Sequence, residues 1–238
     1  MTHYITRFEN GRTYSKADTY AVSVQPDQRL NAVVTYIENC VAQLRHHGGP
    51  TGLSFCRWGG SSNKDRDFRE ASFLAIDYDI HVFEELKDAA DRLGFARVWF
   101  DGENKSRTQN TIVMVIPLAA PANKHEAERI ICCLVKELDI YGLVDGALAI
   151  NHITNIHATT LTAYERGALL DPQAFIQRTA KMYQSRDATK YYGQRPARVS
   201  SEPNATITTH DDLFEWSSRD ADTPIRQTKA LMGAQPLT

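Results

Sequence analysis

The chain has 238 residues, with 27 Lys or Arg against 29 Asp or Glu, and a formal net charge of -2. A nearly neutral chain has no global basic surface for nucleic acid, so any such contact must be local. No apolar run approaches the roughly 20 residues of a membrane span, and we expect no signal peptide at the polar N-terminus and no membrane partner. The four cysteines show no CxxC spacing, which disfavours a zinc knuckle or a disulfide scaffold and favours a reducing cytoplasm.

The first quarter of the chain predicts strands around one helix. Tyr4–Phe8 and Tyr20–Val24 have the composition of short strands, and an Asn-Gly turn signal lies between them. Apolar residues at helical spacing predict a helix over Gln28–Arg45, which the following His-His-Gly-Gly-Pro stretch ends. Gly52–Trp58 is expected to be another strand.

The middle of the chain predicts a β-α-β-β-α-β order. Phe73–Asp77 is a continuous apolar run, which is typical of a strand buried on both faces. Asn123, with Glu126 three residues later, forms the pattern of a helix capping box. The elements expected after the first strand are a helix (Val82–Leu93, capped by Gly94), a strand (Phe95–Phe100), a polar loop (Asp101–Asn110), a strand (Thr111–Leu118), a helix (Asn123–Asp139) and a strand (Ala147–Ile153).

The last part of the chain predicts one more helix and then a tail. Asp171 and Pro172 are good N-cap and N1 residues for a helix that reaches about Tyr183. From Gln184 onward the composition shifts to Ser, Arg, Asp, Thr and Pro with little periodicity, which is typical of a flexible tail. We therefore expect a folded domain at residues 1–183 and a tail at 184–238. The expected fold class is α+β, with an RRM-like β-α-β-β-α-β core sheet, helices packed on it and an N-terminal α/β segment before it.

The stretch FLAIDYDI, residues 73–80, ends an apolar strand in two aspartates. Because residues i and i+2 of a strand share a face, Asp77 and Asp79 are expected to project together, with Tyr78 opposite. Two carboxylates about 7 Å apart or closer repel each other unless a cation neutralises them. Mg²⁺ and Mn²⁺ take oxygen ligands and share them with phosphates, so the pair fits metal-dependent phosphoryl transfer. The alternative is a strand that runs into a solvated turn, where aspartates are common.

A longer pattern surrounds this pair. The segment SNKDRDFREASFLAIDYDI is followed by GFARVWFDGENKSRTQNTIVMVIPLAAPANKHEAE and then by LVDGALAINHITNIHATT. In this order of motifs, over about residues 52–165, the chain resembles the archaeo-eukaryotic primase superfamily, especially the small primase-polymerase domains of phage and plasmid replication proteins. The resemblance implies a nucleotidyltransferase that uses Mg²⁺ or Mn²⁺ to join nucleotide triphosphates on a DNA template.

The resemblance also implies roles for particular residues. Asp77 and Asp79 match the metal-binding pair of the family, and Asp145, in VDGAL, matches its third acidic position, so these three are the expected catalytic residues and metal ligands. The middle motif of the family, a serine and a histidine two residues apart, is incomplete, because FDGENKSRTQN contains no histidine. Its basic residues can supply the charge that faces the phosphates instead. The expected phosphate-binding residues of this loop are Lys105, Ser106 and Arg107.

A second group of basic residues precedes the strand that carries the two aspartates. Lys64 and Arg66, with Arg69, are expected to hold a template or a triphosphate, provided that their loop faces the aspartates. The alternative is a solvated loop of mixed charge, because acidic residues interleave with the basic ones.

Two histidines and a tryptophan complete the set of candidates. His152 and His157, in NHITNIH, can build a transition-metal site with the two aspartates, or they can be ordinary polar residues at the end of a strand. His152 is also a candidate contact for the template or the nucleotide. Trp58 can stack on a base or pack on the sheet.

Two functions are consistent with this pattern. The first is a metal-dependent primase or primase-polymerase in phage or plasmid replication, which the three aspartates favour. The alternative is a catalytically inactive, primase-like nucleic-acid-binding protein that acts as a replication initiator or accessory factor, which the missing histidine favours. The sequence contains no GxxxxGK[ST] motif, so unwinding would require a separate helicase.

Overall fold

The computed structural model describes residues 2–9, 17–23, 29–47, 51–59, 67–104, 109–144, 146–150 and 152–180. The described strands form one sheet in the order β2-β1-β3-β8-β6-β7-β5-β4, with β9 paired to β6. The pairs of neighbouring strands are antiparallel. The strands are β1 (Thr2–Glu9), β2 (Ala17–Ser23), β3 (Thr51–Ser54), β4 (Cys56–Trp58), β5 (Phe68–Asp79), β6 (Arg97–Asn104), β7 (Gln109–Ala122), β8 (Thr154–Ile156) and β9 (Thr162–Glu165).

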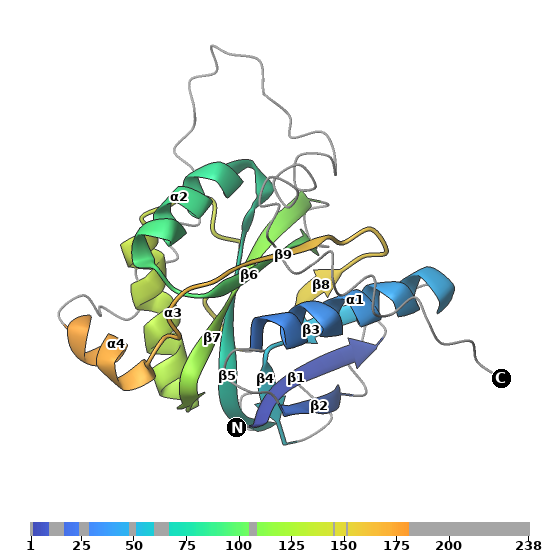
Figure 1. Cartoon of the computed structure of the whole chain (residues 1–238), viewed down its shortest axis with the longest axis horizontal. Coiled ribbons are helices and arrows are strands. Elements are labelled where there is room, and N and C mark those ends of the chain that lie inside the picture. Colours follow the sequence, from blue (N-terminus) through green and yellow to red (C-terminus); the bar gives the residue numbers. More distant parts are fainter. Residues whose placement is uncertain are drawn as a thin grey trace, which may run out of the picture. The chain divides into compact units, whose positions relative to one another are not determined.

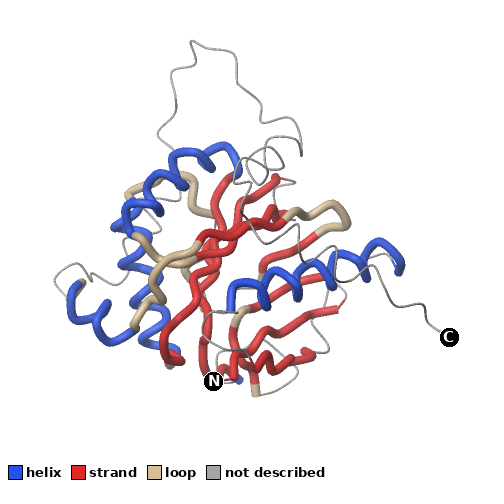
Figure 2. Tube along the Cα trace, viewed as in Figure 1, coloured by secondary structure: helices blue, strands red, loops and turns tan. Residues whose placement is uncertain are grey.

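The helices lie on two sides of this sheet, which makes the fold α+β. Figure 1 shows α2, α3 and α4 together beside β5 and β7, and α1 apart from them, near β1, β3 and β9. In Figure 2 the curved sheet runs between these two groups. The helices are α1 (Arg29–His47), the 3₁₀ helix η3 (Ile80–Val82), α2 (Phe83–Leu93), α3 (Lys124–Leu138) and α4 (Pro172–Arg178).

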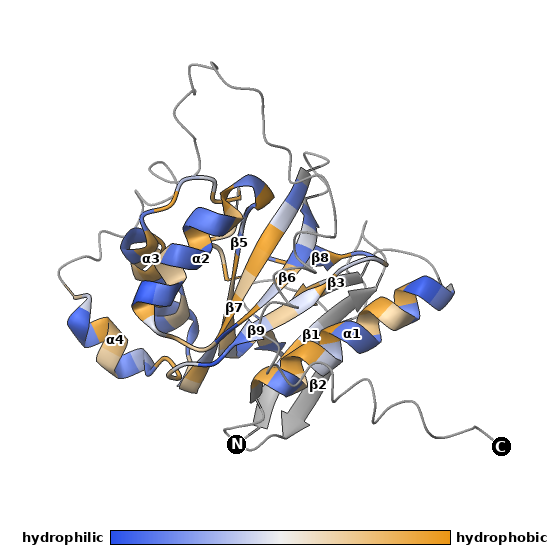
Figure 3. Cartoon of the chain, turned by 45° about the horizontal axis from the view of Figure 1, so that its top comes forward, coloured by the Kyte–Doolittle hydropathy of each residue, from blue (hydrophilic) through white to orange (hydrophobic). Residues whose placement is uncertain are grey.

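The centre of the sheet is formed by β5, β7 and β6, as the apolar runs predict. Phe73, Leu74 and Ile76 are buried on β5, so this strand is covered on both faces. Figure 3 shows that β7 is largely apolar and that α2 and α3 carry both apolar and polar faces. On one face, the ring of Phe55, between β3 and β4, contacts Phe73 and Phe100 at centroid distances of 6.4 and 6.0 Å.

The predicted helix caps are confirmed. Asn123 and Glu126 form a complete capping box at the start of α3. Gly94 ends α2 in the left-handed conformation, at φ 69°. Asp171 accepts a hydrogen bond from the backbone nitrogen of Ala174, and Pro172 opens α4. The predicted end of this last helix at about Tyr183 is wrong, because α4 ends at Arg178 with Thr179 as its C-cap, and Ala180 follows in a turn.

The structure corrects several predicted elements. Gly52–Trp58 was expected to be one strand, but it is divided at Phe55, so that β3 pairs with β1 and β8 while β4 pairs with β5. Asp101–Asn104 was expected to belong to a polar loop but extends β6, because it pairs with Gln109–Ile112 of β7. Ala147–Ile153 was expected to be a strand, but its described residues form turns, in which each of three backbone nitrogens bonds to the carbonyl three residues earlier. The buried residues of this stretch, Ala147, Ile150 and Ile153, recur every three residues, which is a turn period and not the strand period of two.

The chain order β5-α2-β6-β7-α3-β8 has the expected β-α-β-β-α-β form. The RRM-like sheet order is not confirmed, because β8 pairs with β3 and β6 and not with β5. Beside the end of β5 lies a shorter stretch, in which Leu143 forms an isolated bridge with Tyr78. The N-terminal segment joins the same sheet through β1 and β3.

All the described residues belong to one compact unit, and the four cysteines are buried and form no disulfide. In the described part of the chain, no helix has the length and apolarity needed to cross a membrane.

We predict that a chain truncated after Tyr183 unfolds as cooperatively as the full chain, with a free energy of unfolding within about 0.5 kcal/mol. The residues beyond it carry little pattern of burial in the sequence, so their loss should expose little apolar surface. Urea denaturation followed by circular dichroism measures both quantities. A loss of several kcal/mol would instead mean that the apolar group Leu213, Phe214 and Trp216 packs on the domain.

Candidate functional site

The two aspartates of the FLAIDYDI stretch lie at the C-terminal end of β5, where the strand meets η3. Asp77 is paired with Val113 of β7 and Asp79 with Thr111, while the residue between them, Tyr78, is fully buried. Because side chains alternate along a strand, this register places both carboxylates on one face of the sheet. Asp77 and Asp79 therefore lie on the same face of the sheet, as predicted.

Asp77 is a buried carboxylate with two side-chain partners. Asp77 is only 4% exposed. The hydroxyl of Thr154 donates to Oδ1 at 2.8 Å, and Nε2 of His152 lies 2.9 Å from Oδ2. Burying a carboxylate is costly unless hydrogen bonds or an opposite charge compensate. Both partners provide hydrogen bonds, and His152 also provides the charge when it is protonated. They use two of the roughly four lone-pair positions of a carboxylate, so each oxygen keeps acceptor capacity.

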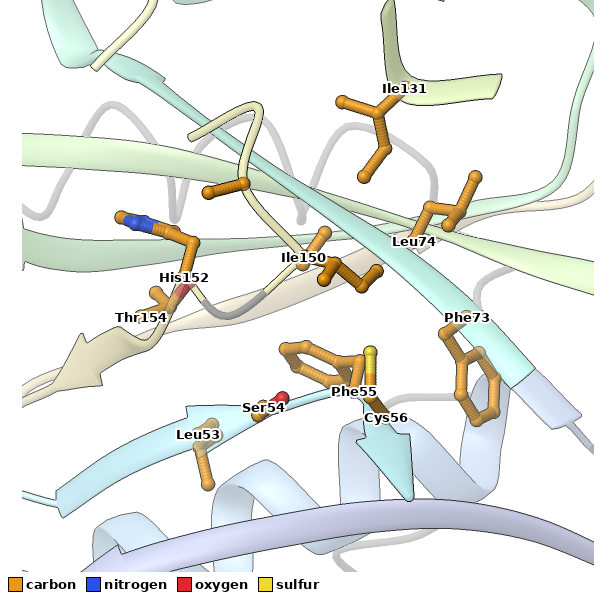
Figure 4. A pocket seen from close by; sticks show the side chains of 12 residues that line it. Leu53, Ser54, Phe55, Cys56, Phe73, Leu74, Ile131, Ile150, His152 and Thr154 are labelled. Carbon is orange, nitrogen blue, oxygen red and sulfur yellow. The ribbon is translucent and has the colours of Figure 1, made fainter. Parts of the chain in front are cut away.

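His152 responds to this environment. Burial, the largest single influence, lowers the pKa of His152, but the charge of Asp77 and the hydrogen bond to it outweigh burial. The pKa of His152 is therefore raised above the ordinary value of 6.5. Apolar surroundings strengthen the pair, because His152 and Thr154 line a pocket whose other walls include Phe55, Phe73 and Ile150 (Figure 4).

Asp79 has a structural role at the end of the strand. Its Oδ1 accepts a hydrogen bond of 3.0 Å from the backbone nitrogen of His81 and so caps η3. Its own backbone nitrogen donates to the carbonyl of Gly142 at 2.8 Å. Gly142 has φ 101°, and a Cβ there would lie 3.2 Å from Val82. A glycine is thus needed where this segment passes β5.

A second backbone bond draws the same segment along β5. The nitrogen of Val144 donates to the carbonyl of Asp77 at 3.0 Å. Asp145, the third predicted acidic residue, lies outside the described residues, but its neighbour Val144 is fixed beside Asp77. Within the described ranges, no group of three or more His, Cys, Asp or Glu side chains is placed to hold a metal ion.

The basic loops can be placed only in part. The predicted phosphate-binding and template-binding residues Lys105, Ser106, Arg107, Lys64 and Arg66 lie outside the described residues. The strands that flank the first loop are described, and the last pair of their ladder, Asn104 with Gln109, lies two residues beyond the row that contains Thr111. That hairpin therefore ends at the same edge of the sheet as Asp79.

Of the second basic group, which comprises Lys64, Arg66 and Arg69, the structure describes Arg69, and this residue lies far from the edge of the sheet that carries Asp79. Arg69 lies near the start of β5, eight residues before Asp77, which corresponds to about 26 Å along an extended strand. Arg69 was expected in a loop before the strand, but it belongs to β5 itself, and the length of the strand separates it from the aspartates.

Gly102 brings three strands together beside the two aspartates. It is paired with Thr111 of β7, which is paired in turn with Asp79. A Cβ at Gly102 would lie 2.9 Å from Oγ1 of Thr111, 3.1 Å from the carbonyl oxygen of Asn155 and 3.2 Å from Cγ2 of Thr154. The absence of a side chain at this position lets β8 approach β6 and β7.

The structure separates the two histidines of NHITNIH. Nε2 of His157 lies 3.1 Å from Oδ2 of Asp101, not beside the DxD pair. Asp101 is paired with Ile112, which is paired with Tyr78, so its side chain is on the opposite face from Asp77. A transition-metal site that combines both histidines with the two aspartates is therefore not formed by these described residues.

Asp101 is the residue that the sequence analysis missed. It is 5% exposed and follows the buried strand residues Trp99 and Phe100, just as Asp77 follows an apolar run. The sequence thus contains the same signal twice: an apolar strand that ends in an aspartate, at Asp77 and at Asp101, with a histidine further along the chain. Trp58, a candidate for base stacking, is buried; its ring packs edge-on against Phe68 and its Nε1 donates to Ser54.

The comparisons with known proteins give one structural similarity. No protein-family model matches the chain, and no curated protein matches it. Among solved structures, the fold is similar to the AEP domain of the primase-polymerase (PrimPol) of cyanophage S-2L, with 12% sequence identity and a TM-score of 0.43, over 74% of this chain and 88% of that chain. A similarity of this size does not assign a function, and we infer none from it.

We predict that Thr154→Val destabilises the protein by about 1–3 kcal/mol, because it leaves one oxygen of a buried carboxylate without its hydroxyl donor. Thr154→Ser keeps the hydroxyl and is the matched control, with a cost of about 1 kcal/mol or less for the lost methyl group. Urea denaturation of both variants measures the difference. Equal costs would show that the methyl group, which packs over Gly102, matters as much as the hydrogen bond.

Proposed function

We propose that this protein is a metal-dependent nucleotidyltransferase of the primase-polymerase kind, which joins nucleotide triphosphates on a DNA template in phage or plasmid replication. The observation that carries the proposal is the buried, hydrogen-bonded position of the Asp77 carboxylate. Two hydrogen-bonding partners hold its carboxylate in one orientation, on the same face as Asp79 and beside the chain that leads into Asp145. Carboxylates that bind metals are commonly oriented by such outer hydrogen bonds.

The donor set fits Mg²⁺ or Mn²⁺. Both ions prefer carboxylate oxygens and share their coordination with phosphates. Asp77, Asp79 and Asp145 would hold the metal, and Asp77 keeps acceptor capacity after bonding to Thr154 and His152. When bound, such an ion would neutralise charge on the phosphates of the nucleotide.

The residues of the chain itself would divide the remaining work. His152 and Thr154 keep the Asp77 carboxylate from rotating, which preserves the position of a ligand before substrate arrives. In the proposal, Lys105, Ser106 and Arg107 contact the triphosphate, taking the place of the motif histidine, and Lys64 and Arg66 contact the template. His152 lies close enough to Asp77 to be a second contact for the nucleotide.

One observation favours a non-catalytic alternative. Both oxygens of Asp77 and Oδ1 of Asp79 already accept hydrogen bonds from the protein, so these carboxylates also make sense as purely structural groups. Under that alternative, the chain is a primase-like nucleic-acid-binding protein that serves as a replication initiator or accessory factor.

The test of the proposal is manganese-dependent nucleotide incorporation on primed and unprimed DNA templates. We expect activity in the wild type and a loss of at least about a hundredfold in Asp77→Asn/Asp79→Asn, because ligand charge is removed while the shape of the side chains is kept. Glu85→Ala/Asp88→Ala, on the exposed face of α2, is the control with the same change in charge.

The thermal midpoint with and without Mn²⁺ separates the two functions. A metal-binding wild type should be stabilised by Mn²⁺, and the asparagine double variant should not. If Mn²⁺ shifts both proteins equally and no nucleotide is incorporated on either template, the proposal of an enzyme is wrong and the nucleic-acid-binding alternative is preferred.

A second prediction concerns the loop that replaces the motif histidine. Changing Lys105 and Arg107 together to alanine should weaken nucleotide affinity by about 1–3 kcal/mol, the usual size for charge-assisted hydrogen bonds. Isothermal titration calorimetry of wild type and double variant measures the difference. Lys87→Ala/Arg92→Ala on α2, which removes the same charge, is the control. An unchanged affinity would exclude these two residues as the substitute for the histidine.

A further inference from the structure

Residues 152–161 form one continuous segment that is attached to the sheet by two aspartate–histidine pairs. At its start, His152 lies 2.9 Å from Asp77, and five residues later His157 lies 3.1 Å from Asp101. The two aspartates lie on different strands and on opposite faces of the sheet. Between the two histidines lies β8, which carries Thr154, the second partner of Asp77.

The second attachment involves the whole β8–β9 turn, residues 157–161. The backbone nitrogen of Leu161 donates to Oδ1 of Asp101 at 2.5 Å, while Oδ2 faces His157. The hydroxyl of Thr160 donates to the carbonyl of Asp101 at 3.0 Å and accepts from the nitrogen of His157. Asp101 therefore contacts His157 and Leu161, the two ends of the turn, through its side chain, and Thr160 through its backbone carbonyl.

β8 itself has little pairing of its own. It is three residues long, pairs with β3 over those residues, and pairs with β6 only at Asn155 opposite Glu103. A ladder this short forms few hydrogen bonds, and these offset little of the conformational entropy that the chain loses when it is ordered. Besides the burial of Ile156, what is attached to its two ends therefore contributes to its position.

We propose that Asp101 and His157 are positioning residues for Asp77: by fixing the C-terminal end of β8, they hold Thr154 and His152 where they reach the carboxylate. Neither residue touches Asp77, and they act through the three residues of β8. The relevance of this arrangement to nucleotide transfer depends on the proposed function, but the coupling between the two aspartates does not.

The coupling depends on pH because His157 is titratable. The hydrogen bond to Asp101 is the main cause that raises the pKa of His157; burial opposes it, and the charges of Asp101 and Glu103 add to it. Other groups that face the turn come from α1, where Arg45 donates to the carbonyl of Ala158. Also on α1, Glu38 accepts from the hydroxyl of Thr162, just beyond the turn.

The sign of the effect follows from this direction. A histidine whose pKa is raised by folding stabilises the folded state fully below its unfolded pKa of about 6.5 and loses that contribution as pH rises through the folded pKa. The attachment of the β8–β9 turn should therefore weaken from slightly acidic to alkaline pH.

The experiment measures hydrogen-exchange protection of the β8 amides from about pH 6 to about pH 9, around the titration of histidine. In the wild type, protection relative to intrinsic exchange should fall roughly threefold to tenfold across this range, the size expected when one charge-assisted hydrogen bond becomes a neutral one. Asp101→Asn keeps the shape of the side chain and should remove the part of the step that comes from His157, as should His157→Gln. The part that remains belongs to the pair of His152 and Asp77. Glu103→Gln, which removes a nearby charge but leaves the bond to Asp101, should keep the part that comes from His157.

A double-mutant cycle tests whether the effect reaches Asp77. If Asp101→Asn already displaces β8, adding Thr154→Val should cost less than it does in the wild type, so the combined fold-change in the unfolding constant should be at least about threefold below the product of the two single changes. Should Asp101→Asn fail to fold, His157→Gln takes its place in the cycle. A product equal to the combined change, or a protection of β8 that does not vary with pH in the wild type, overturns the proposal.

These outcomes are independent of the enzyme test. Exchange and unfolding need neither metal nor nucleotide, so a protein without incorporation activity can still show the coupling. A protein with full activity and an additive cycle would disprove the coupling and leave the proposed function standing.

Discussion

The arrangement around the candidate site depends on a single buried carboxylate. Asp77 sits at the end of an otherwise apolar strand, where an ionised group is stable only if its partners are close and correctly oriented. Those partners, His152 and Thr154, come from a segment 75 or more residues further along the chain. The position of that segment, the turn that follows it and the spacing between β6 and β8 all determine whether Asp77 keeps them.

This constraint makes the two interpretations of the site less opposed than they first appear. Hydrogen bonds that stabilise a buried aspartate are the same bonds that would orient it as a metal ligand. The bonds alone therefore do not separate an enzyme from a binding protein with the same fold. What separates them is whether Asp77, Asp79 and Asp145 also bind a cation together, which is a property of the three side chains and not of the fold.

The sequence predicted the parts of the molecule whose cause is local. The buried strand at Phe73–Asp77, the capping box at Asn123 and the glycine end of α2 follow from periodicity and from cap chemistry within a few residues. The shared face of Asp77 and Asp79 follows from the geometry of any strand. These features need no knowledge of the partners in the sheet.

The parts that could not be predicted have causes far away in the chain. Asp101–Asn104 is polar and has the composition of a loop, yet it is strand because β7 supplies its partners. His152 and His157 look equivalent in NHITNIH, but the sheet gives each a different aspartate on a different face. Ala147–Ile153 is rich in apolar residues and was expected to be a strand, but its buried residues Ala147, Ile150 and Ile153 recur every three residues, as in a series of turns.

Gly102 has a consequence for how relatives of this chain can be recognised. Because even one methyl group at that position would press on Thr111, Thr154 and the backbone of Asn155, a chain with a bulkier residue there needs a different spacing between β6, β7 and β8, the strand that carries Thr154 to its carboxylate. Glycine at this point of the β6 strand is thus tied, in this chain, to the close approach of β8 that brings Thr154 to the buried aspartate. A divergent sequence with aspartates at both DxD positions but a branched residue at 102 would share the motif without sharing the architecture behind it.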